Sequence, residues 1–406
     1  MAVNLAPPAE LLAVPGITLA TGAAAIKAED RDDLTLIRLD AGTSVAGVFT
    51  QSAFRAAPVL IAEPRIQAGG IRALLINSGN ANAATGDPGV DDALSLCRAA
   101  ATALDVPEEA VLPFSTGVIG ERLPVAAMAQ VIESLPNGLD SGNWLAAAKA
   151  IMTTDTVAKA ASLQIELDGR TITLTGMAKG SGMIRPDMAT MLAYVCTDAA
   201  ISPDCLQRLL ATATAASFNR ITVDGDTSTN DAFILAATGQ AGNGLIDDPA
   251  SAEAGVLLEG LISIARTLAQ AIVRDGEGAT KFVTVAVEGG ANEAECLQVA
   301  YTIAESPLVK TALFASDPNW GRLAMAIGRA GIEHLDPTGV QVFFDDVQVM
   351  HNGLMDPNYT EEAGAEVLAA EEFTIRVQLG RGAAAVEVWT SDLSYEYVRI
   401  NAEYRT

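Results

Sequence analysis

Residues 179–192 read KGSGMIRPDMATML, and the fold and function of the whole chain depend on how this stretch behaves. A Gly-Ser-Gly loop carrying one lysine leads to Pro186-Asp187, and after Ala189 an apolar run begins at Thr190. One interpretation is a plain loop that enters a buried strand, with Thr190 as an ordinary β-branched strand residue. The other interpretation is a self-cleaving segment in which Thr190 becomes a nucleophile.

The scarcity of histidine bears on this choice. The chain has only two histidines, His334 and His351, and both lie in ordinary loop or strand-end sequence. A Ser-His or Cys-His enzyme needs a positioned imidazole, so Cys196, with no histidine near it in the sequence, is a poor candidate nucleophile. A threonine at a new N-terminus can use its own α-amine, with a pKa of about 7.7–8.0, as the base. To create that terminus, the Thr190 hydroxyl would first attack the Ala189 carbonyl.

Composition excludes several other classes of function. The net charge is −25, with 25 Lys+Arg against 50 Asp+Glu, which disfavours nucleic acid and an acidic membrane surface as partners. No pair of the four cysteines has C-x-x-C spacing, and no metal-ligand motif is present; Asp224-Gly225-Asp226 lacks the rest of a calcium loop and is interpreted as structural. We expect no signal peptide and no transmembrane helix, and therefore a cytoplasmic protein.

Hydrophobic periodicity predicts a mixture of hairpins and clustered helices, an α+β fold without an obvious linker or repeat. The clearest hairpin joins residues 163–167 and 171–174 through Asp168-Gly169. Further strands are expected at 34–39, 73–76, 233–236, 282–287, 340–350 (a hairpin), 373–379 and 385–390. Helices are expected at 91–104, 125–135, 144–152, 202–216, 252–273, 297–304 and 322–330.

The stretch at 179–192 resembles the self-cleavage segment of the ornithine acetyltransferase family, also called glutamate N-acetyltransferase. The resemblance extends over essentially the whole chain, and seven further runs occur in the order typical of that family. They are NSGNAN (77–82), STGVIG (115–120), MTTDT (152–156), TVDGDTSTND (222–231), GEGATK (276–281), DPNWGR (317–322) and INAEYRT (400–406).

The resemblance implies a role for each matching residue. Cleavage falls between Ala189 and Thr190, Thr190 is the nucleophile, and Thr116 and Gly117 form the oxyanion hole. The substrate-binding positions are Thr153, Lys179, Thr190, Glu277, Asn401 and Thr406. These roles are chemically reasonable, because a Ser-Thr-Gly turn can aim donors at an oxyanion and a lysine can pair with a carboxylate.

The implied reaction moves the acetyl group of N2-acetyl-L-ornithine to L-glutamate through an acetylated Thr190, in arginine biosynthesis. No cofactor is implied, although some members of the family also accept acetyl-CoA as a substrate. The implied fold is an α-β-β-α sandwich built jointly by an alpha chain, 1–189, and a beta chain, 190–406, in an α2β2 heterotetramer. Two alternatives stay open: an amidase or aminopeptidase that releases the acyl group to water, and an amino-acid-binding protein that neither cleaves itself nor turns over.

Overall fold

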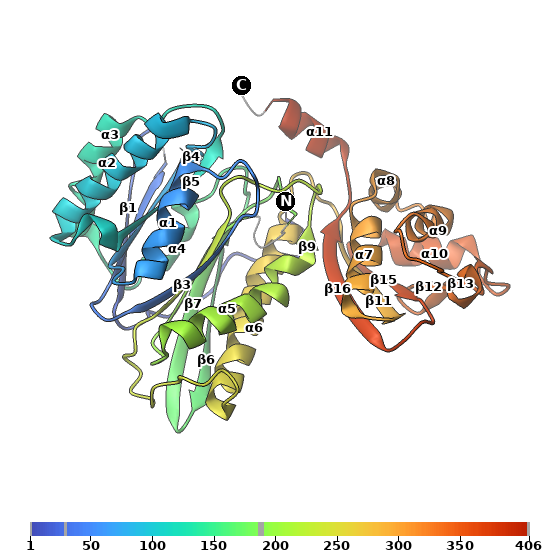
Figure 1. Cartoon of the computed structure of the whole chain (residues 1–406). Helices are drawn as coiled ribbons and strands as arrows, with labels where there is room; N and C mark the ends of the chain where they lie inside the picture. Colours follow the sequence, from blue (N-terminus) through green and yellow to red (C-terminus); the bar gives the residue numbers. More distant parts are fainter. Residues whose placement is uncertain (1, 28–30, 186–190, 404–406) are drawn as a thin grey trace.

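The computed structural model describes residues 2–27, 31–185 and 191–403. Two bodies lie side by side in it (Figure 1): a layered sandwich formed by the first two thirds of the chain and a smaller unit formed by the last third. Helix α11 (Tyr395–Ala402) extends from the smaller unit back over the top of the sandwich.

The first sheet of the sandwich has the order β1-β2-β4-β5. These strands are Ile17–Gly22, Leu34–Leu39, Ala73–Asn80 and Val111–Val118. Strands β1, β2 and β4 are antiparallel neighbours, whereas β4 and β5 run parallel and end at the same edge of the sheet. That shared edge carries the NSGNAN and STGVIG runs, which therefore lie together.

The second sheet has the order β3-β10-β8-β7-β6. Its strands are Ser44–Phe49, Ala232–Ala237, Leu192–Thr197, Arg170–Lys179 and Lys159–Leu167. Strands β7 and β8 are antiparallel neighbours with Lys179 opposite Leu192. The expected boundary at 189/190 thus falls between two adjacent strands, and strands from both sides of it build one sheet.

Two layers of helices complete the sandwich. Buried side chains of α2 (Gly86–Leu104) and α3 (Val125–Ile132) cover the outer face of the first sheet, and those of α5 (Pro203–Ala215) and α6 (Ala252–Arg274) cover the second. Between the sheets, α1 (Ala57–Ala68) and α4 (Trp144–Ala150) add to the core. The predicted α-β-β-α sandwich is confirmed.

Strand β8 shows why the second sheet is buried on both faces. Leu192, Tyr194 and Cys196 point into the core between the sheets, while Ala193 and Val195 point to the helices. Such alternation follows from the two-residue period of a strand. The apolar run after Thr190 is therefore a central strand, as the plain interpretation of that run required.

The smaller unit was not part of the expected sandwich. Its seven-stranded sheet has the order β14-β13-β12-β15-β11-β16-β9. In that order the strands are Leu354–Met355, Val347–His351, Gln341–Phe344, Glu372–Gln378, Phe282–Gly290, Ala384–Ser391 and Ile221–Thr222. Its helices are α7 (Glu293–Ala304), α8 (Pro307–Phe314), α9 (Trp320–Gly328) and α10 (Glu361–Ala369).

Helix α6 is the one described helix that is long and apolar enough to cross a membrane. Its apolar residues, including Leu257, Leu261 and Leu268, are buried in the core below the second sheet. This is the composition of a core helix, so α6 gives no membrane-protein character to the fold.

Candidate active site

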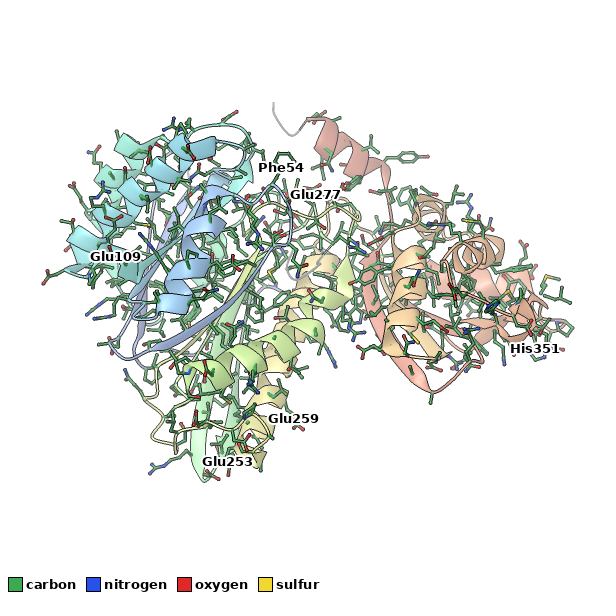
Figure 2. The ribbon with its side chains drawn as sticks, viewed as in Figure 1. Phe54, Glu109, Glu253, Glu259, Glu277 and His351 are labelled. Atoms are coloured by element: carbon green, nitrogen blue, oxygen red, sulfur yellow. The ribbon has the colours of Figure 1, made fainter. Side chains whose placement is uncertain are left out.

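One cavity of about 260 Å³ collects most of the expected site residues. Thr116, Gly117, Thr153, Lys179, Glu277 and Asn401 all line it. Ala189, Thr190 and Thr406 lie outside the described residues, although Met191, the residue after Thr190, also lines the cavity. Figure 2 shows Glu277 at the junction of the two bodies, below α11. Residues that are nearly 300 positions apart in the sequence thus line the same cavity.

The oxyanion side of the cavity lies at the end of β5. Ser78 pairs with Thr116, and Gly79 pairs with Gly117, after which the register shifts at Asn80. Gly117 has φ +136°, and a Cβ there would lie 2.2 Å from the carbonyl carbon of Gly79. Only glycine fits this conformation and this close approach. The STGVIG run is therefore a tight strand end that turns backbone toward the cavity, as an oxyanion hole requires.

Lys179 is the buried cation of the cavity. Its side chain, at the end of β7, is 8% exposed, and its ammonium donates a hydrogen bond to the Thr116 hydroxyl at 3.3 Å. Burial lowers the pKa of Lys179, as does the neighbouring Lys159, while the carboxylates of Asp155, Asp231 and Glu277 oppose the shift. A lysine ammonium with few protein partners beside an oxyanion turn suits a substrate carboxylate.

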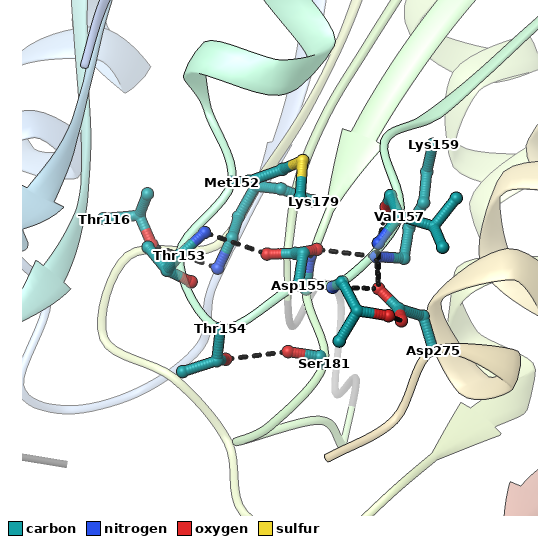
Figure 3. Close-up of polar contacts among 12 residues, drawn as sticks. Thr116, Met152, Thr153, Thr154, Asp155, Val157, Lys159, Lys179, Ser181 and Asp275 are labelled. Carbon is teal, nitrogen blue, oxygen red and sulfur yellow. Dashed lines mark hydrogen bonds and ion pairs between the residues drawn. The ribbon is translucent and has the colours of Figure 1, made fainter. Parts of the chain in front are cut away.

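A buried charge triad holds the loop that carries Thr153 (Figure 3). The Lys159 ammonium lies 2.7 Å from the Asp155 carboxylate and 2.6 Å from that of Asp275, and all three side chains are almost fully buried. Asp155 also accepts hydrogen bonds from the backbone of Thr153 and Gly180, at 3.0 and 2.7 Å. The Asp155 carboxylate therefore fixes both the loop that carries Thr153 and the residue after Lys179.

Asp275, the third member of the triad, lies two residues before Glu277 and connects the triad to it. Asp275 accepts hydrogen bonds from the backbone of Thr156 and Val157, at 2.9 and 3.2 Å. Two residues later, the Glu277 backbone donates to the Ser181 carbonyl at 2.8 Å, and Ser181 and Thr154 share a hydroxyl hydrogen bond of 2.7 Å. The three loops that carry Thr153, Lys179 and Glu277 are thus fixed to one another.

Glu277 and Asn401 form another part of the cavity wall. The Asn401 amide donates a hydrogen bond of 2.7 Å to the Glu277 carboxylate. Glycines on either side allow this approach, because a Cβ at Gly182 would lie 2.5 Å from the Glu277 carboxyl and one at Gly278 would lie 2.5 Å from the Tyr397 backbone nitrogen. The GEGATK run thus positions the Glu277 carboxylate and allows α11 to pack closely against Gly278.

The helix that carries Asn401 buries little apolar surface. Tyr395 is 83% exposed and Val398 is 62% exposed, and no residue of α11 is buried. The Tyr395 ring contacts Phe314 edge to face, with 5.4 Å between the ring centroids, and polar contacts add to this. The Ser394 hydroxyl donates to the Gly278 carbonyl at 2.6 Å, and the Tyr397 hydroxyl lies 3.3 Å from Asp224.

The other candidate residues from the sequence are accounted for by the structure. Asp224 accepts hydrogen bonds from the backbone of Met183 and Ile184 at 2.7 and 2.9 Å, which confirms a structural role for the Asp-Gly-Asp loop. Burial raises the pKa of the Cys196 thiol to about 12, which makes it inert. Both histidines are exposed and neither lines the cavity; His351 lies at the far end of the smaller unit (Figure 2).

Sequence reasoning assigned no role to Asn230 and Asp231, although it quoted their motif. The Asn230 amide donates to the carbonyls of Ala81 and Ser115, at 2.6 and 2.9 Å, and so joins the two runs at the oxyanion edge. Asp231 lines the cavity. The position of TVDGDTSTND between a loop and an apolar strand was the available signal, but the carbonyl partners of the Asn230 amide lie more than 100 positions away.

The glycine-dependent turn at Thr116-Gly117, the buried Lys179 and the Glu277-Asn401 pair line one cavity, and such a set of groups suits an enzyme that transfers an acyl group. The chain belongs to the ArgJ family, whose model matches residues 18–406. This confirms the resemblance to the ornithine acetyltransferase family and, with it, the expected enzyme class: a glutamate N-acetyltransferase of arginine biosynthesis.

Individual relatives agree with this assignment. The arginine biosynthesis bifunctional protein ArgJ of Pseudomonas syringae pv. tomato is 54% identical, with 100% of both chains covered. The protein of the same name from Pseudomonas fluorescens is 51% identical, again over 100% of both chains. A crystal structure of the arginine biosynthesis bifunctional protein from Bacillus halodurans is 40% identical with a TM-score of 0.51, covering 53% of this chain and 100% of that one.

Proposed function

We propose that this enzyme cuts itself between Ala189 and Thr190 and then carries the acetyl group on Thr190, from N2-acetyl-L-ornithine to L-glutamate. The observation that supports this most directly is the cavity in which Thr116, Gly117, Lys179, Glu277 and Asn401 meet beside Met191. In the first half-reaction, the Thr190 hydroxyl attacks the acetyl carbonyl, the Thr190 α-amine takes the hydroxyl proton, and the turn at Thr116-Gly117 stabilises the oxyanion.

The substrate-binding roles follow from charge. Lys179 pairs with the α-carboxylate that ornithine and glutamate share, while Glu277, Asn401 and Thr153 contact the amine side of the amino acid, together with Thr406. After ornithine leaves, glutamate enters the same cavity and its amine attacks the acetyl ester. Two amino acids that alternate in one cavity give ping-pong kinetics.

The test is a mass measurement on the purified chain. Wild-type protein should run as segments of residues 1–189 and 190–406, and Thr190→Ala should remain a single intact chain. Incubation with N-acetylornithine without glutamate should add one acetyl group to the 190–406 segment alone. A full-length wild-type chain that turns over acetylornithine, or an enzyme with intersecting initial-rate lines and no acetylated segment, would contradict the mechanism.

We also propose acetyl-CoA as a second acetyl donor. A second cavity of about 230 Å³ shares Gly117, Thr153 and Thr154 with the first and includes Lys27 and Arg31 in its lining. A long thioester donor can reach the same oxyanion turn through this cavity while the amino-acid wall stays free. Rates of glutamate acetylation with each donor, compared on one preparation, test this; no rate with acetyl-CoA would restrict the enzyme to acetylornithine.

For assembly and location we propose an α2β2 heterotetramer in the cytoplasm. All four cysteines are buried free thiols, which suits a reducing compartment. The exposed Tyr395, Val398 and Phe54 leave apolar surface on and near α11 that an oligomer can cover. Native mass spectrometry of the cleaved enzyme distinguishes one pair of segments from two.

A further inference from the structure

Asp231 is a buried carboxyl group in the cavity whose only hydrogen bonds among the described residues are local ones from Ser228. It lies directly before β10, is 3% exposed, and lines the same cavity as Thr116 and Lys179. Its Oδ2 atom is buried and has no hydrogen-bond partner in the part of the chain that the structure describes. A buried polar atom without a partner costs stability, so its retention points to a role outside the fold.

Other buried aspartates of the described chain behave differently. Asp155 and Asp275 bind Lys159 and backbone amides, Asp392 accepts from Thr280 at 2.8 and 2.6 Å, and Asp198 accepts from the Thr173 backbone at 2.8 Å. Each of these braces two segments of chain. Asp231 therefore stands apart from the aspartates that hold the fold together.

The neighbours of Asp231 place its carboxyl group at the reacting end of the cavity. On one side, the backbone of Ala232 donates to the Met191 carbonyl at 2.9 Å and Ala232 pairs with Leu192, so Asp231 lies beside the first residues after Thr190. On the other side, Asn230 is bonded to Ser115, next to the oxyanion turn. Burial raises the pKa of Asp231 well above its usual value, against the opposing effects of Ser228 and Lys179. Burial thus favours the protonated form of the group.

The reaction needs a proton at this place. An amide nitrogen leaves a tetrahedral intermediate only when it has been protonated, because an amide anion is a very poor leaving group. We propose that Asp231 is a further catalytic residue, which gives its proton to the acetamide nitrogen of N-acetylornithine as the intermediate collapses. This inference rests on the proposed acetyl-Thr190 mechanism.

The proton balance closes within the site. The C–N bond of the substrate breaks, the new ester bond to Thr190 remains, and ornithine leaves as a neutral amine. Asp231 is left as a carboxylate, and the Thr190 α-ammonium, which took the hydroxyl proton at the start, returns a proton to it. The second half-reaction runs these steps in reverse. Asp231 passes its proton to the Thr190 α-amine, the resulting carboxylate accepts the proton of the attacking glutamate amine, and the α-ammonium protonates the Thr190 oxygen as the ester bond breaks.

The test compares two acetyl donors in Asp231→Asn, with glutamate as the acceptor. N-acetylornithine must expel an amine, whereas p-nitrophenyl acetate expels a phenolate that needs no proton. Acetylation of Thr190 by N-acetylornithine should fall by roughly 100- to 10,000-fold, the usual range for loss of a general acid, while acetylation by p-nitrophenyl acetate stays near the wild-type rate. Equal losses with both donors, or no loss with either, would overturn the proposal.

Controls separate this role from folding and from the proposed function. Asp198→Asn changes another buried aspartate with a raised pKa, outside the cavity, and should leave the rates with both donors unchanged. Rates are expressed per free Thr190 terminus, counted by mass spectrometry. If Asp231→Asn cleaves itself poorly, Asp231→Glu replaces it, because this variant keeps a proton donor. Acetylation of Asp231→Glu should still be slowed more with the amide donor than with the ester donor. A wild-type enzyme that forms no acetyl-Thr190 would instead refute the proposed function.

Discussion

At position 117 the backbone of β5 passes so close to Gly79 that a single methyl group decides whether the oxyanion turn can form. Two constraints exclude a side chain at this position: φ is +136°, and a Cβ would lie 2.2 Å from the Gly79 carbonyl carbon. A side chain could relieve neither by moving, because the opposing atoms are backbone. The turn is therefore defined by one glycine and the register of two parallel strands.

Gly117→Ala should accordingly abolish acetyl transfer and lower the yield of folded protein. Gly120→Ala is the matched control: Gly120 has φ +89°, but a Cβ there meets nothing within 4 Å. It should cost only the backbone strain, about 1–3 kcal/mol of stability, and retain activity. Melting temperature and kcat/KM for acetylornithine measure both effects; an active Gly117→Ala enzyme would remove this turn from the oxyanion site.

Among the elements, α11 is unusual because it carries a site residue and buries none of its own. Its position depends on the close approach at Gly278, on the Ser394 hydrogen bond and on the contact between Asn401 and Glu277. A helix held in this way contributes little to global stability. Its sequence therefore matters for the cavity more than for the core.

Asn401→Ala should separate these two contributions. We expect kcat/KM to fall roughly 10- to 150-fold, the equivalent of about 1.5–3 kcal/mol for one charge-assisted hydrogen bond, with no change in melting temperature. Deletion of residues 401–406 should act in the same direction and still permit self-cleavage, which precedes substrate binding. Arg399→Ala, on the same helix and paired with Glu396 and Glu403, is the control. Near-wild-type kcat/KM in the cleaved Asn401→Ala enzyme would exclude Asn401 from the site.

At the scale of the whole molecule, residues on the two sides of the expected cleavage point are interleaved. Strand β8 is hydrogen-bonded to β7, and β10 is hydrogen-bonded to β3, so the two strands from the second part of the chain lie between strands from the first part. The buried ion pair of Lys159 with Asp275 crosses the same boundary. Cleavage at 189/190 would break one peptide bond and leave these contacts in place.

The two segments should therefore stay together after cleavage. We expect residues 1–189 and 190–406 to co-elute on size exclusion at neutral pH and at high salt, and to separate only in denaturant, because buried pairs are little screened by salt. Separation of native segments by salt alone would show that the sheet does not hold them.

The triad also predicts how stability depends on pH. Although burial alone would raise the pKa of Asp155, Lys159 and Lys179 lower it well below its usual value. A depressed carboxyl pKa stabilises the fold above the unfolded pKa of about 4, and this stability is lost as the pH falls below that value. Asp155→Asn should thus destabilise the protein by about 3 kcal/mol or more at pH 7, where it breaks a buried pair.

Chemical unfolding of wild type and Asp155→Asn, at pH 7 and again near pH 3, measures this difference. The gap between the two proteins should narrow in acid, since the wild-type carboxylate loses its advantage there. Asp336→Asn provides a control on the surface, in a short turn where the carboxylate accepts from Thr338 at 2.9 Å. A gap that stays constant with pH would show that the charge of Asp155 is not what stabilises the loop.

The sequence by itself determined the local elements and the family. The predicted strand at 34–39 coincides with β2, and the Asp-Gly hairpin and the long helix from Ala252 were also confirmed, because periodicity and turn chemistry are local properties. Helix α1 went unpredicted, since Pro64 lies inside it and its stability comes from packing. The resemblance to the family's motifs also predicted most of the expected site residues that line the cavity.

Only the tertiary structure decided what those residues touch. Asp155 and Asp275 are 120 positions apart, yet they share one lysine, and Asn401 meets Glu277 across 124 positions. The sequence does not show how α11 is seated, that the last third of the chain forms a separate seven-stranded unit, or that Asp231 Oδ2 is buried without a hydrogen-bond partner among the described residues. The physical reason is that burial, ion pairing and close approach depend on which segments are brought together, and a linear pattern records only what lies within a turn or two.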